Sequence, residues 1–348
     1  MASCKVCNKD SPLTSSFLGL CANCVRNNFD LALPYIQQAH AQARKPFKLP
    51  TNIPQDLDGK RCNLCVNACQ VKLDGVGFCG LSIDSRKEAS LVWYYDSLPT
   101  NCVADWVCAG SSDFGYKNLA VFYNACSFDC LFCQNWHFRE ANLSKKILAQ
   151  DLANKVDKRT SCICYFGGDP TPQLPHSLLV SHIARESNKV RTLRICWETN
   201  GSMNPKYLKE MLEICLESGG CIKFDLKTRT EELNIALCGT SNKQTLENFK
   251  FAATYIEKRP HSPLLVASTL LVPGYVDIYE VEKIAHFIAT LNPSIPYSLL
   301  AFHPQFLMND LPMTSRLHAQ KAKEVALKAG LKNVRIGNIH LLSDDYQV

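Results

Sequence analysis

The sequence predicts an α/β protein whose main part is a full or partial TIM-type (β/α) barrel, preceded by small cysteine-rich metal-binding segments. From about residue 116, apolar runs rich in β-branched and aromatic residues alternate with helical patterns that have a polar face. Such alternation is typical of a parallel sheet with right-handed crossovers. Unusual glycine and polar residues follow the ends of several strands, where a barrel of this type carries its chemistry.

Seven runs are expected as strands: residues 119–123, 162–166, 194–198, 221–226, 264–272, 297–302 and 334–339. Helical patterns between them cover residues 145–156, 204–217, 243–256, 279–291 and 315–329. The barrel is therefore expected over residues 116–348. Before it we expect a knuckle segment over 1–30, a linker over 31–60 that starts with a weakly helical piece, and a cysteine-rich lead segment over 61–115.

Length, composition and charge limit the classes of protein to which the sequence can belong. The chain has 348 residues, 46% hydrophobic and 20% charged, which allows one large domain and a small appendage. The net charge of +6 is dispersed, so nucleic acid is not an expected partner. Neither an apolar stretch long enough to span a membrane nor a signal peptide is found, so a cytoplasmic protein without membrane contact is expected. In that compartment, 19 cysteines indicate metal ligands rather than disulfides.

The expected strand 119–123 leads directly into a cysteine triplet with the spacing C-x3-C-x2-C. Its members are Cys126, Cys130 and Cys133, with the aromatic Phe132 immediately before the last. Three thiolates on one short loop can hold three irons of a 4Fe–4S cluster and leave the fourth iron open. The triplet is therefore predicted to be the metal centre of the barrel.

Two further cysteine groups precede the barrel. The first, spaced C-x2-C-x13-C-x2-C, suits a structural zinc ion, with an iron site or free thiols as alternatives; it consists of Cys4, Cys7, Cys21 and Cys24. The second can hold zinc, which we favour, or an auxiliary iron–sulfur cluster, and consists of Cys62, Cys65, Cys69 and Cys79. Cys102 and Cys108 could complete a metal site or be buried thiols, and we favour buried thiols. Cys164, Cys196, Cys215 and Cys238 are expected to be core or incidental thiols.

Residues 116–348 resemble the radical S-adenosylmethionine (SAM) superfamily, and within it the pyruvate formate-lyase activating enzyme group. The motifs that carry the resemblance are CSFDCLFCQN, FGGDPTP, ETNG, KFDLK, LLVPGY and LLAFHP. Residues 61–80 and the CQNW sequence are similar to the AmmeMemoRadiSam proteins of that group. The resemblance covers about two-thirds of the chain and leaves the first cysteine group outside it.

The resemblance implies that SAM chelates the open iron and is cleaved by one electron to methionine and a 5′-deoxyadenosyl radical. It also implies a role for each strand end. Gly167 and Gly168 would let backbone approach the methionyl group, and Asp169, in place of the usual Glu, would face its ammonium group. Thr199 and Asn200 would contact the ribose or sulfonium region.

The same resemblance assigns the remaining SAM contacts. Lys227 would pair with the SAM carboxylate, Asp225 with a ribose hydroxyl, and Phe132 and His303 would lie against adenine. Asp225 and Lys227 are two residues apart and so point the same way on a strand. Alternatively, they form a structural pair, and His303 is a hydrogen-bonded core histidine. Asn135 is expected to brace the cysteine loop, whereas Asn338 and His340 are expected to be packing or capping residues.

The leading hypothesis is a radical SAM enzyme of oxidoreductase or activase type that abstracts hydrogen from an unknown substrate. A protein substrate, activated to a glycyl radical, is one version, with a flavodoxin or ferredoxin as electron donor. An RNA-modifying enzyme that uses the N-terminal knuckles to bind RNA is a second hypothesis. A non-enzymatic iron–sulfur or zinc scaffold protein is a third, but it would not explain the polar motifs at the strand ends.

Overall fold

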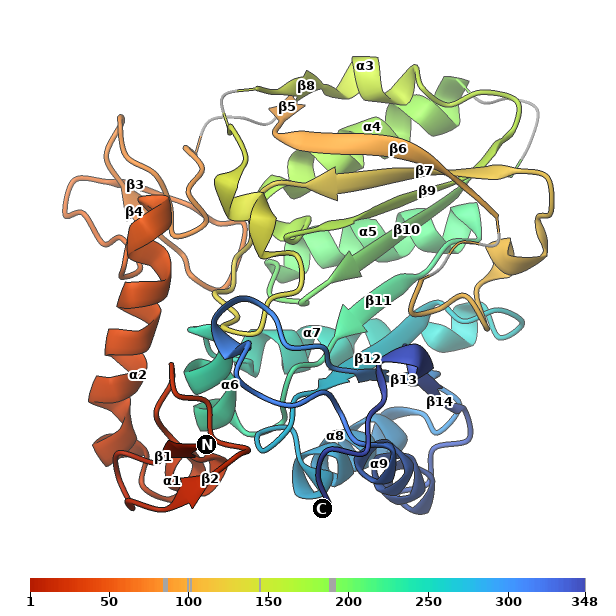
Figure 1. Cartoon of the computed structure of the whole chain (residues 1–348). Helices are drawn as coiled ribbons and strands as arrows, with labels where there is room; N and C mark the ends of the chain where they lie inside the picture. The colour runs from red at the N-terminus through yellow and green to blue at the C-terminus, as the bar shows by residue number, and fades with distance from the viewer. Residues whose placement is uncertain (84–86, 99, 101, 144, 188–191, 348) are drawn as a thin grey trace.

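The computed structural model describes residues 1–348 except 84–86, 99, 101, 144, 188–191 and 348. Its centre is an eight-stranded sheet with the order β14-β13-β12-β11-β10-β9-β7-β6 (Figure 1). Seven of these strands run parallel: β7 (Lys117–Tyr123), β9 (Thr160–Gly167), β10 (Arg194–Thr199), β11 (Ile222–Asp225), β12 (Leu265–Leu271), β13 (Tyr297–Ala301) and β14 (Val334–Gly337). Each predicted strand corresponds to one of them, which confirms the α/β fold.

The barrel is partial rather than full. Among the described residues, β14 and the antiparallel strand β6 (Leu91–Ser97) form the two edges of the sheet and do not pair with each other. Strand β6 was not predicted, because LVWYYDS has no clear alternation of apolar and polar residues. It pairs with β7 along its whole length, with Leu91 opposite Tyr123.

Helices follow most of the parallel strands, and three of the described helices are capped at their start by a side chain. The helices that follow the strands are α4 (Leu174–Ser187), α5 (Pro205–Ser218), α6 (Glu231–Cys238), α7 (Lys243–Ala253), α8 (Ile278–Leu291) and α9 (Arg316–Lys328). Asn204, Asp277 and Ser315 accept backbone hydrogen bonds at the starts of α5, α8 and α9. Gly219 ends α5 with a φ of 76°, the left-handed conformation that favours glycine.

Alternate residues of the strands face these helices. Trp197 of β10 donates a hydrogen bond to Ser177 of α4, and Tyr165 of β9 bonds Ser181 of the same helix. Because side chains alternate along a strand, Cys164, Cys196 and other residues one position away face the interior of the barrel. The interior-facing residues build the site described below.

The N-terminal part contains β1 (Ala2–Ser3), β2 (Asp10–Ser11), α1 (Ala22–Asn27) and α2 (Phe29–Arg44). Helix α2 occupies half of the segment expected as a linker and is packed, not loose. It runs beside the barrel toward β3 (Lys60–Arg61) and β4 (Gln70–Val71) (Figure 1). Ile36, His40 and Arg44 of α2 are buried, and both α1 and α2 contact α6. The Pro-rich residues 45–59 that follow α2 form no long helix or strand.

Other expected elements are shorter in the structure. Residues 145–156 form β8 (Ile147–Leu148), which pairs with β5 (Glu88–Ala89), and the short helix α3 (Ala149–Ala153). The last strand stops at Gly337, because Asn338 has a φ of 53° and starts the 3₁₀ turn η7 (Ile339–Leu341). The other 3₁₀ turns are η1 (Lys45–Phe47), η2 (Ala109–Ser112), η3 (Trp136–Glu140), η4 (Thr171–Gln173), η5 (Ile256–Lys258) and η6 (Phe306–Met308). No helix in the described part of the chain is long and apolar enough to cross a membrane.

Candidate active site

A cavity of ≈ 180 Å³ lies at the carboxyl ends of β9, β10 and β11, beside the loop that follows β7. Its lining includes most of the predicted site residues: Cys126, Cys130, Phe132, Cys133, Gly167, Gly168, Asp169, Thr199, Asn200, Asp225 and Lys227. Parallel strands bring their carboxyl ends to one edge, so residues up to a hundred positions apart meet here.

The cysteine loop is held by the end of α6. The backbone N–H groups of Asp129 and Leu131 donate to the carbonyl oxygens of Cys238 and Leu237, at 2.8 and 2.9 Å. Burial raises the pKa of Cys126 and raises that of Cys133 to about 11. These thiols therefore favour the neutral form until a cation replaces their protons.

The spacing of the loop sulfurs is wider than a single ion requires. Among the described residues, the groups of three or more ligand atoms that lie within 4.8 Å of one another do not include Cys126, Cys130 and Cys133. A tetrahedral zinc ion holds its sulfurs about 3.8 Å apart. A four-iron cluster is larger than one ion, so the wider separation suits it.

Cys238 was expected to be an incidental core thiol, but it lies against the cysteine loop. A hydrogen bond with the Cys238 side chain lowers the pKa of Cys130, whereas burial raises the pKa of Cys238 itself. Cys130 is therefore the loop thiol whose ionised form the chain supports most directly.

Asp129, between the first two cysteines, is the centre of a buried charged network. Its carboxylate accepts from His40 at 2.7 Å, Arg44 at 3.1 Å and Arg139 at 2.5 Å, and its side chain is fully buried. Burial alone would raise the pKa of Asp129, but the hydrogen bond from His40 and the two guanidinium charges lower it. The network joins α2 to the cysteine loop. Sequence reasoning missed it, because His40 and Asp129 are 89 positions apart.

The neighbouring backbone leaves no room for a side chain at Gly167 or Gly168. Gly167 has a φ of 122°, and a Cβ there would lie 2.5 Å from the backbone nitrogen of Tyr123. A Cβ on Gly168 would lie 2.3 Å from the carbonyl oxygen of Ala125. These glycines were predicted to let the backbone approach a ligand closely. In the structure, their close neighbours are backbone atoms at and just after the end of β7.

Asp169 joins the ends of β9 and β10. Its carboxylate accepts from the backbone nitrogens of Thr171 and Asn200, at 2.7 and 2.6 Å, and from the Thr199 hydroxyl at 3.2 Å. Burial raises the pKa of Asp169 despite these donors. Asn200 in turn donates to Ser127 at 2.8 Å, next to Cys126. Asp169 therefore fixes the wall of the cavity, whatever it does for a ligand.

Asp225 and Lys227 form an ion pair inside the cavity. Burial lowers the pKa of Lys227, but the Asp225 carboxylate together with the nearby Cys130 and Cys238 thiols outweighs it, and the net shift is upward. The second carboxylate oxygen, Oδ1 of Asp225, is buried and has no hydrogen-bond partner among the described residues. An unpartnered buried acceptor is costly unless a ligand supplies a donor.

Phe132 and His303, both expected beside adenine, differ in their position relative to the cavity. Phe132 is 2% exposed and lines the cavity, with the Lys227 ammonium nitrogen 5.7 Å from its ring centroid. His303 is not among the described residues that line the cavity. Strand β13 ends at Ala301, and the His303 ring nitrogen Nδ1 lies 3.0 Å from the carbonyl oxygen of Pro304.

Lys223 and Glu198 also line the cavity and were not predicted to act there. They occupy paired positions on β11 and β10 and form an ion pair of 2.6 Å; Lys223 is 3% exposed. The signal in the sequence is the alternation Lys223–Asp225–Lys227, which places three charged residues on one side of the chain. Asn135, expected to brace the cysteine loop, donates to the Gly167 carbonyl oxygen at 3.4 Å.

Comparison with known proteins identifies the family. The family model of the radical SAM superfamily matches residues 120–288. The putative glycyl-radical enzyme activating enzyme of Methanocaldococcus jannaschii is 30% identical over 217 residues, which cover 60% of this chain and 77% of that one. The chain belongs to the radical SAM superfamily.

Two further relatives match other lengths of the chain. An uncharacterized protein of Methanocaldococcus jannaschii is 25% identical over 308 residues, 80% of this chain and 81% of its own. The pyruvate formate-lyase 1-activating enzyme of Escherichia coli K12 is 24% identical over 198 residues, 56% and 77% of the two chains. Radical SAM membership supports an enzyme and implies a 4Fe–4S cluster and SAM as its cofactors. The widely spaced loop thiols and the unpartnered Asp225 oxygen fit these two groups.

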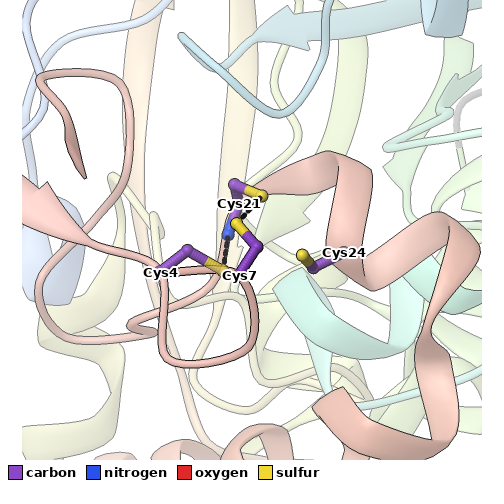
Figure 2. A group of neighbouring side chains, drawn as sticks. All are labelled: Cys4, Cys7, Cys21 and Cys24. Carbon is purple, nitrogen blue, oxygen red and sulfur yellow. Dashed lines mark hydrogen bonds between the residues drawn. The ribbon is translucent and has the colours of Figure 1, made fainter. Parts of the chain in front are cut away.

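The first cysteine group precedes residues 120–288, which the family model matches. Figure 2 shows its four side chains as neighbours. Its four sulfurs all lie within 4.8 Å of one another, and it consists of Cys4, Cys7, Cys21 and Cys24. Burial would raise the pKa of Cys4, but hydrogen bonds from backbone N–H groups lower it to about 6. Four sulfurs so close together match the geometry of a single tetrahedral ion.

The second cysteine group is more open. Its members line a small cavity of ≈ 20 Å³ and, among the described residues, do not form a group within 4.8 Å; they are Cys62, Cys65, Cys69 and Cys79. Burial raises the pKa of Cys79 to about 12. The spacing therefore fits a multi-iron cluster better than the single zinc ion favoured from the sequence.

Proposed function

We propose that this radical SAM protein binds a 4Fe–4S cluster at Cys126, Cys130 and Cys133 and generates a 5′-deoxyadenosyl radical that abstracts hydrogen from a protein substrate. When bound, the cluster supplies one electron that breaks the sulfonium–C5′ bond of SAM. The main support is the unpartnered Asp225 oxygen in the same cavity as the three thiols.

The polar side chains of the cavity suit the polar groups of SAM. The Lys227 ammonium would attract the carboxylate, and the free oxygen Oδ1 of Asp225 would accept from a ribose hydroxyl. Thr199 and Asn200 line the same cavity and would contact the ribose or sulfonium region. Asp169 already accepts several hydrogen bonds, so we assign it mainly a positioning role, with its charge facing the SAM ammonium.

The apolar part of the cavity would protect a reactive radical. Phe132 packs against the position proposed for adenine, and aliphatic and aromatic side chains complete the lining, among them Val103, Phe138, Phe166, Leu270 and Leu300. Apolar walls exclude water and offer few polar groups to side reactions.

The protein substrate is proposed from the relatives. Two of them are named as activating enzymes, one for a glycyl-radical enzyme and one for pyruvate formate-lyase. We therefore place a glycine of a partner protein as the group from which hydrogen is taken, and a flavodoxin or ferredoxin as the electron donor. Formation of the doublet electron-spin-resonance signal of a glycyl radical in a partner protein would support this version.

The test of SAM cleavage is anaerobic. The reconstituted full chain is reduced in the presence of SAM, and 5′-deoxyadenosine is measured by mass spectrometry. We expect product from the wild type and from Cys215→Ala, a buried thiol on α5 outside the cavity, but none from Cys126→Ala. Asp225→Asn keeps the shape of the side chain and should weaken SAM binding about tenfold. A wild type that binds iron yet forms no product would falsify the proposal, as would unchanged iron content in Cys126→Ala.

The same preparation tests the cysteine groups before the barrel. If the second group holds an auxiliary cluster, iron should reach about eight per chain and fall to about four in Cys65→Ala. Zinc should remain in that variant, because the first group suits a single structural ion. If the wild type holds only about four irons and Cys65→Ala does not change that number, the second group binds zinc rather than a cluster.

A further inference from the structure

A row of three thiols crosses the interior of the barrel. Cys164 of β9 is the register partner of Cys196 of β10. Cys221 directly precedes Ile222, the partner of Trp197, and therefore falls opposite Cys196. The Cys221 nitrogen donates to the Cys196 sulfur at 3.4 Å. Cys196 and Cys221 are 3% and 2% exposed.

A fourth thiol reaches this row from another part of the chain. Cys108 precedes the turn η2, in the segment between β6 and β7. Its sulfur and those of Cys196 and Cys221 all lie within 4.8 Å of one another. Only one other group of described residues is equally close, the N-terminal group that matches a tetrahedral ion. None of the three sulfurs belongs to the cysteine loop or to the described lining of the active-site cavity.

The chemistry of this cluster differs from ordinary barrel packing. The interiors of such barrels are normally filled by bulky aliphatic side chains. Here three sulfurs from separate segments converge, and those of Cys196 and Cys221 are 3.9 Å apart. Thiolates on one zinc ion are about 3.8 Å apart, because each Zn–S bond is about 2.3 Å long. Soft sulfur ligands select soft or borderline ions.

We propose that Cys108, Cys196 and Cys221 bind a single soft divalent ion, Zn²⁺, in the barrel interior on the amino-terminal side of the active-site cavity. The ion would join the segment between β6 and β7 to β10 and the start of β11. Described residues of this segment lie against the inner face of the sheet, where Trp106 donates to Ser298 of β13 at 3.1 Å. The site would thus hold the segment in place, independently of the reaction proposed for the cavity.

The test uses the full chain, purified without oxygen and loaded with ¹¹³Cd²⁺ as the probe. Each thiolate site gives its own cadmium resonance. We expect one resonance to disappear in Cys196→Ser and in Cys108→Ala, with one equivalent of zinc lost from the corresponding zinc-loaded proteins. Cys215→Ser is the matched control, since Cys215 is a buried thiol on α5 whose sulfur donates to the Ile195 carbonyl oxygen. It should retain every resonance.

Cys108→Ala keeps the test decisive if Cys196→Ser does not fold, because Cys108 is only half-buried and lies outside the sheet. A folded Cys108→Ala protein with the same cadmium resonances and zinc content as the wild type would overturn the proposal. Iron with acid-labile sulfide that is lost with Cys108 would also overturn it, because the three thiols would then hold a cluster.

Discussion

Gly167 is a residue at which the backbone conformation and the neighbouring strand both act against a side chain. Its φ is 122°, and a Cβ would meet the Tyr123 nitrogen at 2.5 Å. Gly115 is a matched control, with a φ of 80° and no atom within 4 Å of the position of a Cβ. Alanine at Gly115 should cost only about 1 kcal/mol of backbone strain.

Alanine at Gly167 should cost roughly 3 kcal/mol or more, because the contact with β7 adds to that strain. Urea unfolding of the two variants measures the difference in the free energy of unfolding. Equal losses would mean that the end of β7 moves aside without cost.

His176 gives the fold a dependence on pH. It is 1% exposed, and its Nε2 lies 3.1 Å from the Ile147 carbonyl oxygen while its Nδ1 bonds the Tyr123 hydroxyl at 2.8 Å. Burial lowers its pKa to about 4 from the ordinary 6.5. Below pH 6.5 this histidine therefore binds a proton in the unfolded chain but not in the folded chain. The free energy of unfolding falls as the pH decreases toward 4.

Between pH 7.5 and pH 5 this histidine should remove about 2 kcal/mol from the free energy of unfolding. His176→Gln should reduce the loss measured over that range by the same amount. Leu179→Gln, at an exposed residue of the same helix that does not titrate, should leave the loss unchanged. If both variants respond to pH as the wild type does, His176 is not the source.

The residues of the cavity differ in how readily the sequence reveals them. The cysteine triplet is local in sequence, and Asp225 and Lys227 share one side of the chain, so spacing alone predicts that they lie together. The role of Gly167 depends on β7, which no local pattern shows. His303 follows a strand that ends two positions before it, and its ring turns to the backbone of Pro304.

Among the elements, α2 has the clearest influence on the site. His40 and Arg44, one turn apart on this helix, both reach Asp129 in the cysteine loop. Asp129→Asn would leave two buried guanidinium groups without their counter-charge. Breaking a buried pair in this way typically costs about 3–5 kcal/mol.

We expect Asp129→Asn to lower the free energy of unfolding by about that amount and to reduce iron retained on the cysteine loop. Asp157→Asn is the control, because Asp157 is exposed and its pair with Lys117 should contribute less than about 1 kcal/mol. Full iron content and wild-type stability in Asp129→Asn would show that the network does not support the loop.

The parallel strands could be predicted because each is a buried apolar run, and the structure moves their limits by only a few residues. The packing of α2 could not, because its buried face includes His40 and Arg44, which an apolar pattern does not count. Residues 145–156 show the reverse error. They carry a helical pattern, but Ile147 and Leu148 pair with β5 instead.

At the scale of the whole molecule, the first cysteine group is attached to the barrel rather than separate from it. Arg26 of α1 bonds Asp277 at 2.7 Å, and the Tyr275 hydroxyl donates to the Leu20 carbonyl oxygen at 2.8 Å. Helix α1 also contacts α6, whose end holds the cysteine loop. Metal bound at the first group should therefore stabilise the barrel as well.

Cys4→Ser combined with Cys7→Ser should remove one equivalent of zinc and lower the Tm by roughly 5 to 10 °C. Iron on the cysteine loop should fall too, because α6 loses the packing of α1. Scanning calorimetry and metal analysis measure both effects, with Cys215→Ser as control. Loss of zinc without a change in Tm would make the first group an independent appendage.

The Lys223–Glu198 pair lies between the active-site cavity and thiols in the barrel interior. Lys223 lines the cavity, and its ammonium nitrogen also lies 3.3 Å from the Cys164 sulfur and 3.7 Å from the Cys102 sulfur. A thiol S–H bond is weak and gives up its hydrogen atom readily to a carbon radical, whereas ammonium N–H bonds are strong. A radical formed in the cavity would therefore meet a layer of strong bonds before it reached the sulfurs of the interior. If the cavity forms the radical proposed above, Lys223 would shield these thiols from it.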